Sequence, residues 1–202
     1  MDAIFQIIIL IMSVVIHEVS HGYAAEALGD PTARYAGRLT LNPLKHIDPV
    51  GSIIVPIILS IIPPHLVFGW AKPVPVNPYN LKAARYGEML VAAAGPASNL
   101  AIALVFGLLI RFNIAGQFLS QSFFTIAASL VLINILLAVF NLIPIPPLDG
   151  SKIFFELVPN RLYQIKDLME KHWLIIFLFF VFFLWRFIDP VIAFLFRLIT
   201  GL

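Results

Sequence analysis

The feature that most constrains the fold is a set of three long apolar runs, at about residues 3–28, 88–112 and 122–143. About 20 apolar residues are enough to cross the hydrocarbon core of a bilayer as a helix. Only 12% of the chain is charged, against about 25% in soluble domains. Helices pair their backbone groups internally, as lipid requires. The sequence therefore predicts an all-α polytopic membrane protein.

The segments between these runs carry weaker signals. Residues 38–42, Arg-Leu-Thr-Leu-Asn, alternate between polar and apolar side chains, which is typical of a strand. Residues 53–68 are apolar but contain three prolines, which favours a re-entrant or surface-lying segment over a straight span. With a last apolar block at 173–202, we expect four to six membrane segments and a small β or extended element between the first two strong helices. The whole chain, residues 1–202, is expected to form one domain.

The distribution of basic residues predicts the topology. Lys and Arg gather in three groups: Arg34, Arg38 and Lys45; Lys72, Lys82 and Arg85; and Lys152, Arg161, Lys166 and Lys171. The loop near 113–121 has none. The positive-inside rule places all three groups in the cytoplasm. The first and third strong helices should then run from outside to inside, and the second should run back. The N-terminus lacks the basic region of a cleaved signal peptide, so we expect the first helix to be retained.

A His-Glu-x-x-His pattern lies within the first apolar run, at His17, Glu18 and His21. Histidines four residues apart share one helix face, so both imidazoles can bind one ion. The glutamate beside them reaches a water on that ion, which is the zinc metalloprotease arrangement. Ionisable residues at membrane depth are costly and mark functional sites by default. The alternative is that the two histidines only hydrogen-bond neighbouring helices.

Two histidines leave a catalytic zinc one protein ligand short. The chain has no cysteine, so His and carboxylate side chains must supply it. The candidates include His46, His65, His172, Asp48, Asp149, Glu156 and Glu170. His17 lies about 21 Å along its helix, near the cytoplasmic end. Asp149 follows the third strong helix, which ends on that same side, and a proline-broken turn can fold it back to the depth of the zinc.

Three ordered stretches resemble the site-2 proteases, which are intramembrane zinc metalloproteases. They are HEVSH at 17–21, GPASN at 95–99 and NLIPIPPLDG at 141–150. The stretches GRLTLNPLKHIDPVG and GWAKPVPVNP resemble the compact prokaryotic subgroup without appended regulatory domains. The resemblance implies that His17, His21 and Asp149 bind one Zn²⁺ and that Glu18 is the general base. It also implies that Asn141 holds the substrate carbonyl or the developing oxyanion.

Other polar residues have plainer interpretations. Asn134 lies seven residues before Asn141, on the same helix face, where interhelical hydrogen bonding is the expected role. The small residues around GPASN predict close helix packing, with Asn99 tuning the site or contacting substrate. His46 is expected in a surface turn. An unwound substrate needs new hydrogen-bond partners in lipid, and strand addition at 38–42, around Leu39 and Leu41, or at 74–78 would supply them.

The expected function is zinc-dependent hydrolysis of a peptide bond in or near a transmembrane segment of a membrane protein, that is, regulated intramembrane proteolysis. The expected location is a prokaryotic cell membrane, with the site opening to the cytoplasm. No basic cluster indicates nucleic-acid binding. A metal transporter or sensor that uses the same His and Asp residues is the alternative. A membrane-anchored protease with Glu156 or Glu170 as third ligand, and an inactive homologue, rank lower.

Overall fold

A computed structural model describes residues 3–55, 57, 61, 69–82, 86–112, 120–158 and 163–202. Its long helices are α1 (Ala3–Ala27), α4 (Gly87–Phe112) and α5 (Gln121–Asn141). All three are long and apolar enough to span a membrane. They coincide with the three apolar runs to within two residues at each end. The all-α prediction is confirmed for the part of the chain that the structure describes.

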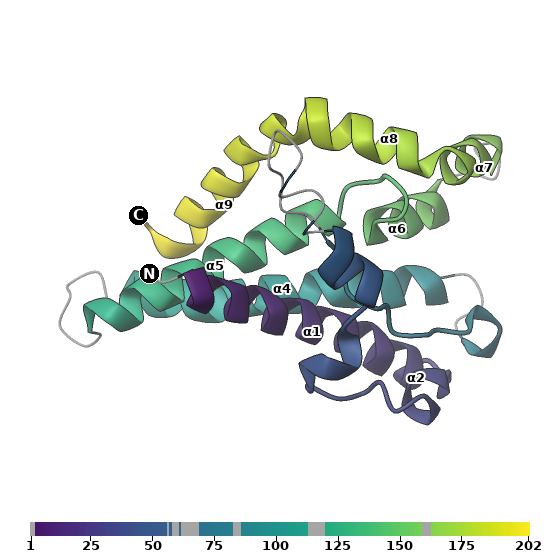
Figure 1. Ribbon diagram of the computed structural model, residues 1–202, viewed down its shortest axis with the longest axis horizontal. Coiled ribbons are helices and arrows are strands. Elements are labelled where there is room, and N and C mark those ends of the chain that lie inside the picture. The colour runs from purple at the N-terminus through teal and green to yellow at the C-terminus, as the bar shows by residue number, and fades with distance from the viewer. Residues whose placement is uncertain are drawn as a thin grey trace.

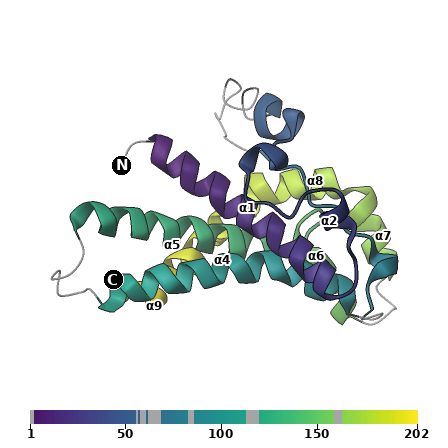
Figure 2. The ribbon, with the colours of Figure 1, turned by 90° about the horizontal axis from the view of Figure 1, so that it is seen from below.

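Helix α4 packs against both α1 and α5. Figures 1 and 2 show that α1 and α5 run in the same direction and that α4 runs in the opposite direction. This is the relative arrangement that the basic residues predict. As a result, the C-terminal end of α5 lies at the same end of the bundle as the C-terminal half of α1.

The end of α1 is fixed by its sequence. Gly29 has a φ of +105°, a conformation that favours glycine, and it follows the last helical turn directly. The next residue, Asp30, is fully buried. Its carboxylate accepts hydrogen bonds from the backbone and hydroxyl of Thr32, from the Asn77 amide at 2.7 Å and from Asn80 Nδ2 at 2.9 Å. Asp30 therefore fastens the segment at 77–80 to the end of α1.

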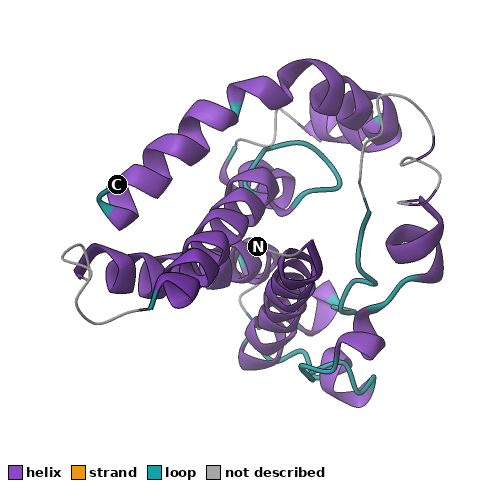
Figure 3. Cartoon of the chain, turned by 60° about the vertical axis from the view of Figure 1, so that its left-hand side comes forward, coloured by secondary structure: helices purple, strands orange, loops and turns teal. Residues whose placement is uncertain are grey.

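Short helical turns follow α1. They are α2 (Thr32–Tyr35), the 3₁₀ turn η1 (Pro43–His46), the π-type turn η2 (Pro49–Ile54) and the 3₁₀ turn η3 (Pro78–Asn80). Figure 3 shows the described residues as helix and loop only. The predicted re-entrant segment, 53–68, lies largely outside the described residues.

The predicted strand at 38–42 is not confirmed. The Arg38 amide donates to the Ala33 carbonyl, and the Thr40 amide donates to the Arg38 carbonyl. The Asn42 amide donates to the Thr40 hydroxyl at 3.2 Å. These amides bond within the loop and its flanking turn, and no strand pairs with this segment in the part of the chain that the structure describes. What the prediction retains is the irregular segment at 69–77, which contains no helix.

The C-terminal part folds over α5. It comprises α6 (Asp149–Leu157), α7 (Tyr163–Lys171), α8 (Trp173–Phe179), the turns η5 (Phe180–Leu184) and η6 (Trp185–Phe187), and α9 (Asp189–Thr200). Figure 1 shows α8 and α9 as an arch along α5. The main apolar core joins α4, α5 and this arch through Ala103, Ile110, Ala127, Val131, Ile135, Phe180, Ile188, Ile192 and Ile199. This core holds the end of α5, and hence the start of α6, in place.

Candidate metal centre and active site

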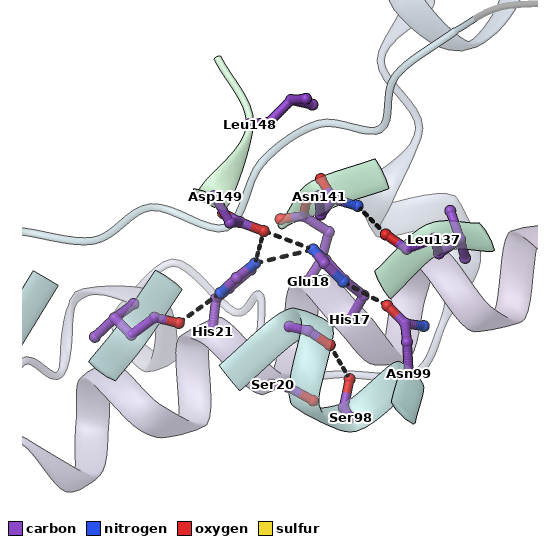
Figure 4. Close-up of polar contacts among 12 residues, drawn as sticks. His17, Glu18, Ser20, His21, Ser98, Asn99, Leu137, Asn141, Leu148 and Asp149 are labelled. Atoms are coloured by element: carbon purple, nitrogen blue, oxygen red, sulfur yellow. Dashed lines mark hydrogen bonds and ion pairs between the residues drawn. The ribbon is translucent and has the colours of Figure 1, made fainter. Parts of the chain in front are cut away.

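Two elements far apart in the sequence bring the candidate ligands together. His17 and His21 lie one turn apart on α1, and Asp149 is the first residue of α6 (Figure 4). The chain turns between α5 and α6 at the sequence Ile-Pro-Ile-Pro-Pro, where the prolines cannot continue the helix. This turn directs the Asp149 carboxylate back toward α1.

The three candidate ligand atoms form a nearly equilateral triangle. Nε2 of His17 and Nε2 of His21 lie 3.1 Å apart. Oδ2 of Asp149 lies 3.1 Å from the first and 3.2 Å from the second. The two histidines are only 6% and 8% exposed. Among the described residues, this is the one group of three or more His, Asp or Glu side chains placed to hold a metal ion.

The hydrogen-bond partners of the two histidines indicate where each ring carries its proton. His21 Nδ1 lies 2.7 Å from the Val91 carbonyl, and His17 Nδ1 lies 2.6 Å from Asn99 Oδ1. Both oxygens accept, so each Nδ1 donates and carries a proton. In a neutral ring the lone pair is then on Nε2. Two such lone pairs face a carboxylate oxygen, and a cation between them would relieve their mutual repulsion.

The dimensions suit zinc. Ligand atoms about 2.0 Å from a tetrahedral zinc lie about 3.3 Å from one another, close to the spacing of the triangle. Two imidazoles and one carboxylate are a donor set of catalytic zinc sites, which keep a fourth position open. Burial raises the pKa of the Asp149 carboxyl, but its contacts with His17 and His21 outweigh burial and hold that pKa well below its usual range. Asp149 is therefore ionised, as a metal ligand must be.

Gly95 on α4 allows the two imidazoles to lie against that helix. A Cβ at this position would lie 2.5 Å from His21 Nε2 and 2.6 Å from His17 Nε2 and Cε1. No side chain fits there while the rings keep these positions. The small residues of GPASN therefore serve the approach of the histidine rings as well as helix packing.

Glu18 lies beside the triangle and faces the irregular segment at 69–77. Its Oε2 accepts a hydrogen bond from the Val74 amide at 2.9 Å. Figure 4 draws Glu18 between the histidines and Asn141. Among the described residues, the hydrogen bond to this carboxylate reaches Oε2 and none reaches Oε1.

Comparison with known proteins bears on this site. The chain is 39% identical to YwhC of Bacillus subtilis, which bears the name of a zinc metalloprotease, over 179 residues that cover 86% of this chain and 78% of the relative. The sequence model of Peptidase family M50 matches residues 109–184. The chain is a member of peptidase family M50, the site-2 proteases. This M50 peptidase is thus a zinc-dependent metalloprotease.

Two mycobacterial relatives are more distant. Rip2 of Mycolicibacterium smegmatis is 33% identical over 141 residues, and Rip2 of Mycobacterium tuberculosis is 31% identical over 140 residues. Both are also named as zinc metalloproteases, and each match covers 69% of the M50 peptidase but 52% of the relative. No solved structure matches the chain.

The structure places the remaining predicted residues of the M50 peptidase as follows. Asn141 is the last residue of α5, and its Nδ2 donates to the Leu137 carbonyl at 2.9 Å. Asn99 is fully buried behind His17, where its polar atoms are taken by protein partners. Leu39 packs toward α1, because a Cβ on Gly22 would lie 2.5 Å from its Cδ2. Leu41 is exposed.

Some residues around the site escape the sequence interpretation. His46 is 2% exposed, so it does not occupy the expected surface turn, and its Nε2 lies 2.9 Å from the Thr40 carbonyl. Ser13 reaches the site through Asn134, a role that no motif indicated. The available signal was spacing, since Ser13 lies four residues before His17 on the same helix face. The Val74 amide left no signal, because a backbone group has no sequence signature.

Proposed function

We propose that this M50 peptidase hydrolyses a peptide bond in or near a transmembrane segment of a membrane protein, in regulated intramembrane proteolysis. His17, His21 and Asp149 hold the zinc and Glu18 is the general base. One observation carries the proposal: ligand atoms of His17 and His21, on a helix apolar enough to span a membrane, lie within 4.8 Å of a carboxylate oxygen of Asp149. We take residues 1–202 as one protease domain.

The residues divide the chemistry among them. Zinc, when bound, polarises a water and the scissile carbonyl and lowers the pKa of that water toward about 7. Glu18 accepts the proton of the attacking water through Oε1 while the Val74 amide holds Oε2. Glu18 then returns the proton to the leaving amine. The triangle of ligands fixes where the water must lie relative to this carboxylate.

Asn141 is suited to the substrate carbonyl. One hydrogen of its Nδ2 is donated to Leu137, and an amide nitrogen carries two. The second hydrogen can be donated to the carbonyl oxygen as it gains negative charge. The position of Asn141 at the end of α5, just before the turn that leads to Asp149, supports this role.

The substrate must unwind before it reaches the site, because a helix buries its own carbonyls. The segment at 74–78 is a poor receptor: the amides of Val74 and Asn77 are already bonded to Glu18 and Asp30. Prolines 75 and 78 have no amide hydrogen to offer. We retain the loop at Leu39 and Leu41 as the substrate contact, because its internal hydrogen bonds use the amides of Arg38, Thr40 and Asn42 rather than those of the two leucines. Leu41→Pro should slow cleavage with normal zinc content, whereas Leu41→Ala should not.

The site is proposed to open toward the cytoplasm of a prokaryotic cell. Hydrolysis consumes water, and the ligands lie toward the C-terminal ends of α1 and α5. Arg34 in α2, just after α1, and Lys82, just before α4, lie at this end. The positive-inside rule supports a cytoplasmic position for this end.

Metal transport is the competing function, because His and Asp side chains would also serve a transport site. Glu18 separates the two. A transporter has no need of a carboxylate that faces the metal site without being part of the ligand triangle. The protein in liposomes should therefore show no zinc flux, whereas a transporter would.

The test of function uses purified protein, a panel of membrane-spanning peptides, and reactions with and without chelator. Wild type should cleave at least one peptide, and chelator should stop it. Glu18→Gln should keep zinc and lose activity by about 10²-fold or more. Glu26→Gln, at the end of the same helix where Glu26 pairs with Arg34, is the matched control and should stay active. Full activity of Glu18→Gln would rule out the proposal.

A further inference from the structure

A chain of buried polar side chains joins the three spanning helices and ends on His17. Ser13 lies on α1, Asn99 on α4 and Asn134 on α5. Ser13 is 2% exposed, and both asparagines are fully buried. Buried amides are costly unless they are hydrogen-bonded, so the way each amide faces is determined by its neighbours.

The orientation of the hydrogen bonds along this series of side chains is set first at Asn134. Its Nδ2 lies 2.8 Å from the Leu130 carbonyl and 3.0 Å from the Ser13 hydroxyl. A backbone carbonyl can only accept, so the nitrogen of this amide must face Leu130. The Oδ1 of Asn134 therefore faces away from Leu130, toward Asn99.

Asn99 takes its direction from Asn134. Its Nδ2 lies 2.8 Å from Asn134 Oδ1 and 3.4 Å from the Ser13 carbonyl, and both are acceptors. Its Oδ1 must then face His17 Nδ1, which lies 2.6 Å away. His17 Nδ1 can only donate to this oxygen. The proton of the neutral ring is therefore on Nδ1, and the lone pair is on Nε2.

We propose that Asn134 is a positioning residue that holds His17, through Asn99, in the tautomer whose Nε2 binds metal. The inference deepens the proposed function, because it rests on His17 as a ligand. Without Asn134, only the longer contact of Nδ2 with the Ser13 carbonyl, at 3.4 Å, still directs the Asn99 amide. The amide can then rotate more easily and offer its nitrogen to His17 Nδ1. The ring would then carry its proton on Nε2, where it blocks the metal.

The first experiment compares zinc affinity among full-length variants in detergent, by competition with a chelating dye. Asn134→Leu should bind zinc about 10–100-fold more weakly, as loss of a ligand's hydrogen-bond partner does. Thr200→Val is the matched control. It removes a buried hydroxyl that donates to the Phe196 carbonyl on α9, and it should keep wild-type affinity. Ser13→Ala leaves the Leu130 carbonyl in place and should have a small effect.

The second experiment reads the tautomer directly and needs no activity. Nuclear magnetic resonance of metal-free protein with isotope-labelled histidine distinguishes Nδ1–H from Nε2–H in neutral rings, and a His17→Gln variant assigns the signal. Wild type should show Nδ1–H at His17, and Asn134→Leu should shift the ring toward Nε2–H. If Asn134→Leu does not fold, the wild-type spectrum decides, because Nε2–H there would overturn the inference.

The outcomes separate this inference from the proposed function. Wild-type zinc affinity in Asn134→Leu would overturn the positioning role and leave the protease intact. Tight zinc binding without peptide cleavage by wild type would refute the proposed function. A weakened affinity in Asn134→Leu would still support the positioning role in that case.

Discussion

The Val74 amide donates a hydrogen bond to Glu18 Oε2 at 2.9 Å, across 56 residues of sequence. The contact joins the proposed general base to the irregular segment at 69–77. Val74 is 7% exposed, and a Cβ on Gly22 of α1 would lie 2.9 Å from its Cγ1. The segment is thus packed on the helix that carries the base, and it fixes which oxygen of Glu18 is available.

Replacement of Val74 tests this contact. Val74→Pro removes the amide hydrogen, so Glu18 should lose its fixed orientation and peptide hydrolysis should fall by about tenfold or more, with zinc content unchanged. Loss of a single charge-assisted hydrogen bond, about 1.5–3 kcal/mol, is the reason for that magnitude. Val74→Ala keeps the amide and serves as control. Equal rates for both variants would show that the contact has no part in catalysis.

Gly95 tests the closeness of the metal site to α4. Gly95→Ala places a methyl group within 2.6 Å of three imidazole ring atoms, so the rings must move and most of the zinc should be lost. Zinc content of the purified variant measures this. Ala97→Leu, which adds more bulk on the exposed face of the same helix, should bind zinc normally. Full zinc occupancy in Gly95→Ala would contradict the arrangement.

Asp30 makes the fold sensitive to pH. Burial raises the pKa of this carboxyl. The hydrogen bonds that it accepts from Thr32, Asn80 and Asn77 lower the pKa by more than burial raises it, so the folded pKa lies below the usual 3.8. The ionised carboxylate thus stabilises the fold above the unfolded pKa, and this contribution is lost as the pH falls through the folded pKa.

Asp30→Ala should therefore lower the free energy of unfolding near pH 7 by about 1–3 kcal/mol, the cost of leaving buried donors unsatisfied. Below about pH 3 the difference from wild type should narrow. Thermal unfolding at the two pH values checks this. Asp167→Ala, on the exposed surface of α7, is the control and should match wild type. A difference that widens in acid would have the wrong sign.

Long apolar runs and the glycine and proline residues that end them predicted most of the fold. The three long helices follow from apolar runs bounded by Gly29 and by the proline-rich turn before Asp149, and such local signals survive folding. The relative direction of α1 and α5 followed from the positions of basic residues. The strand at 38–42 is not confirmed, because alternation reports which side chains are buried and contains no information about a partner strand.

The candidate site was predictable only where side chains have a sequence signature. His17, Glu18 and His21 follow the His-Glu-x-x-His spacing on one helix. Asp149 was predictable because the topology places it at the same side of the membrane as these residues. The Val74 amide, the Val91 carbonyl and the room provided by Gly95 arise from tertiary contacts. Asn134 was expected to bond between helices, but its direction depends on the Leu130 carbonyl, which no pattern indicates.

The central claim is that one zinc ion is held jointly by α1 and the start of α6. The most direct measurement is zinc content per chain in wild type and in Asp149→Ala, with Asp189→Ala, an exposed residue at the start of α9, as control. We expect one zinc in wild type and in the control, and little or none in Asp149→Ala. One tightly bound zinc in Asp149→Ala would contradict this claim.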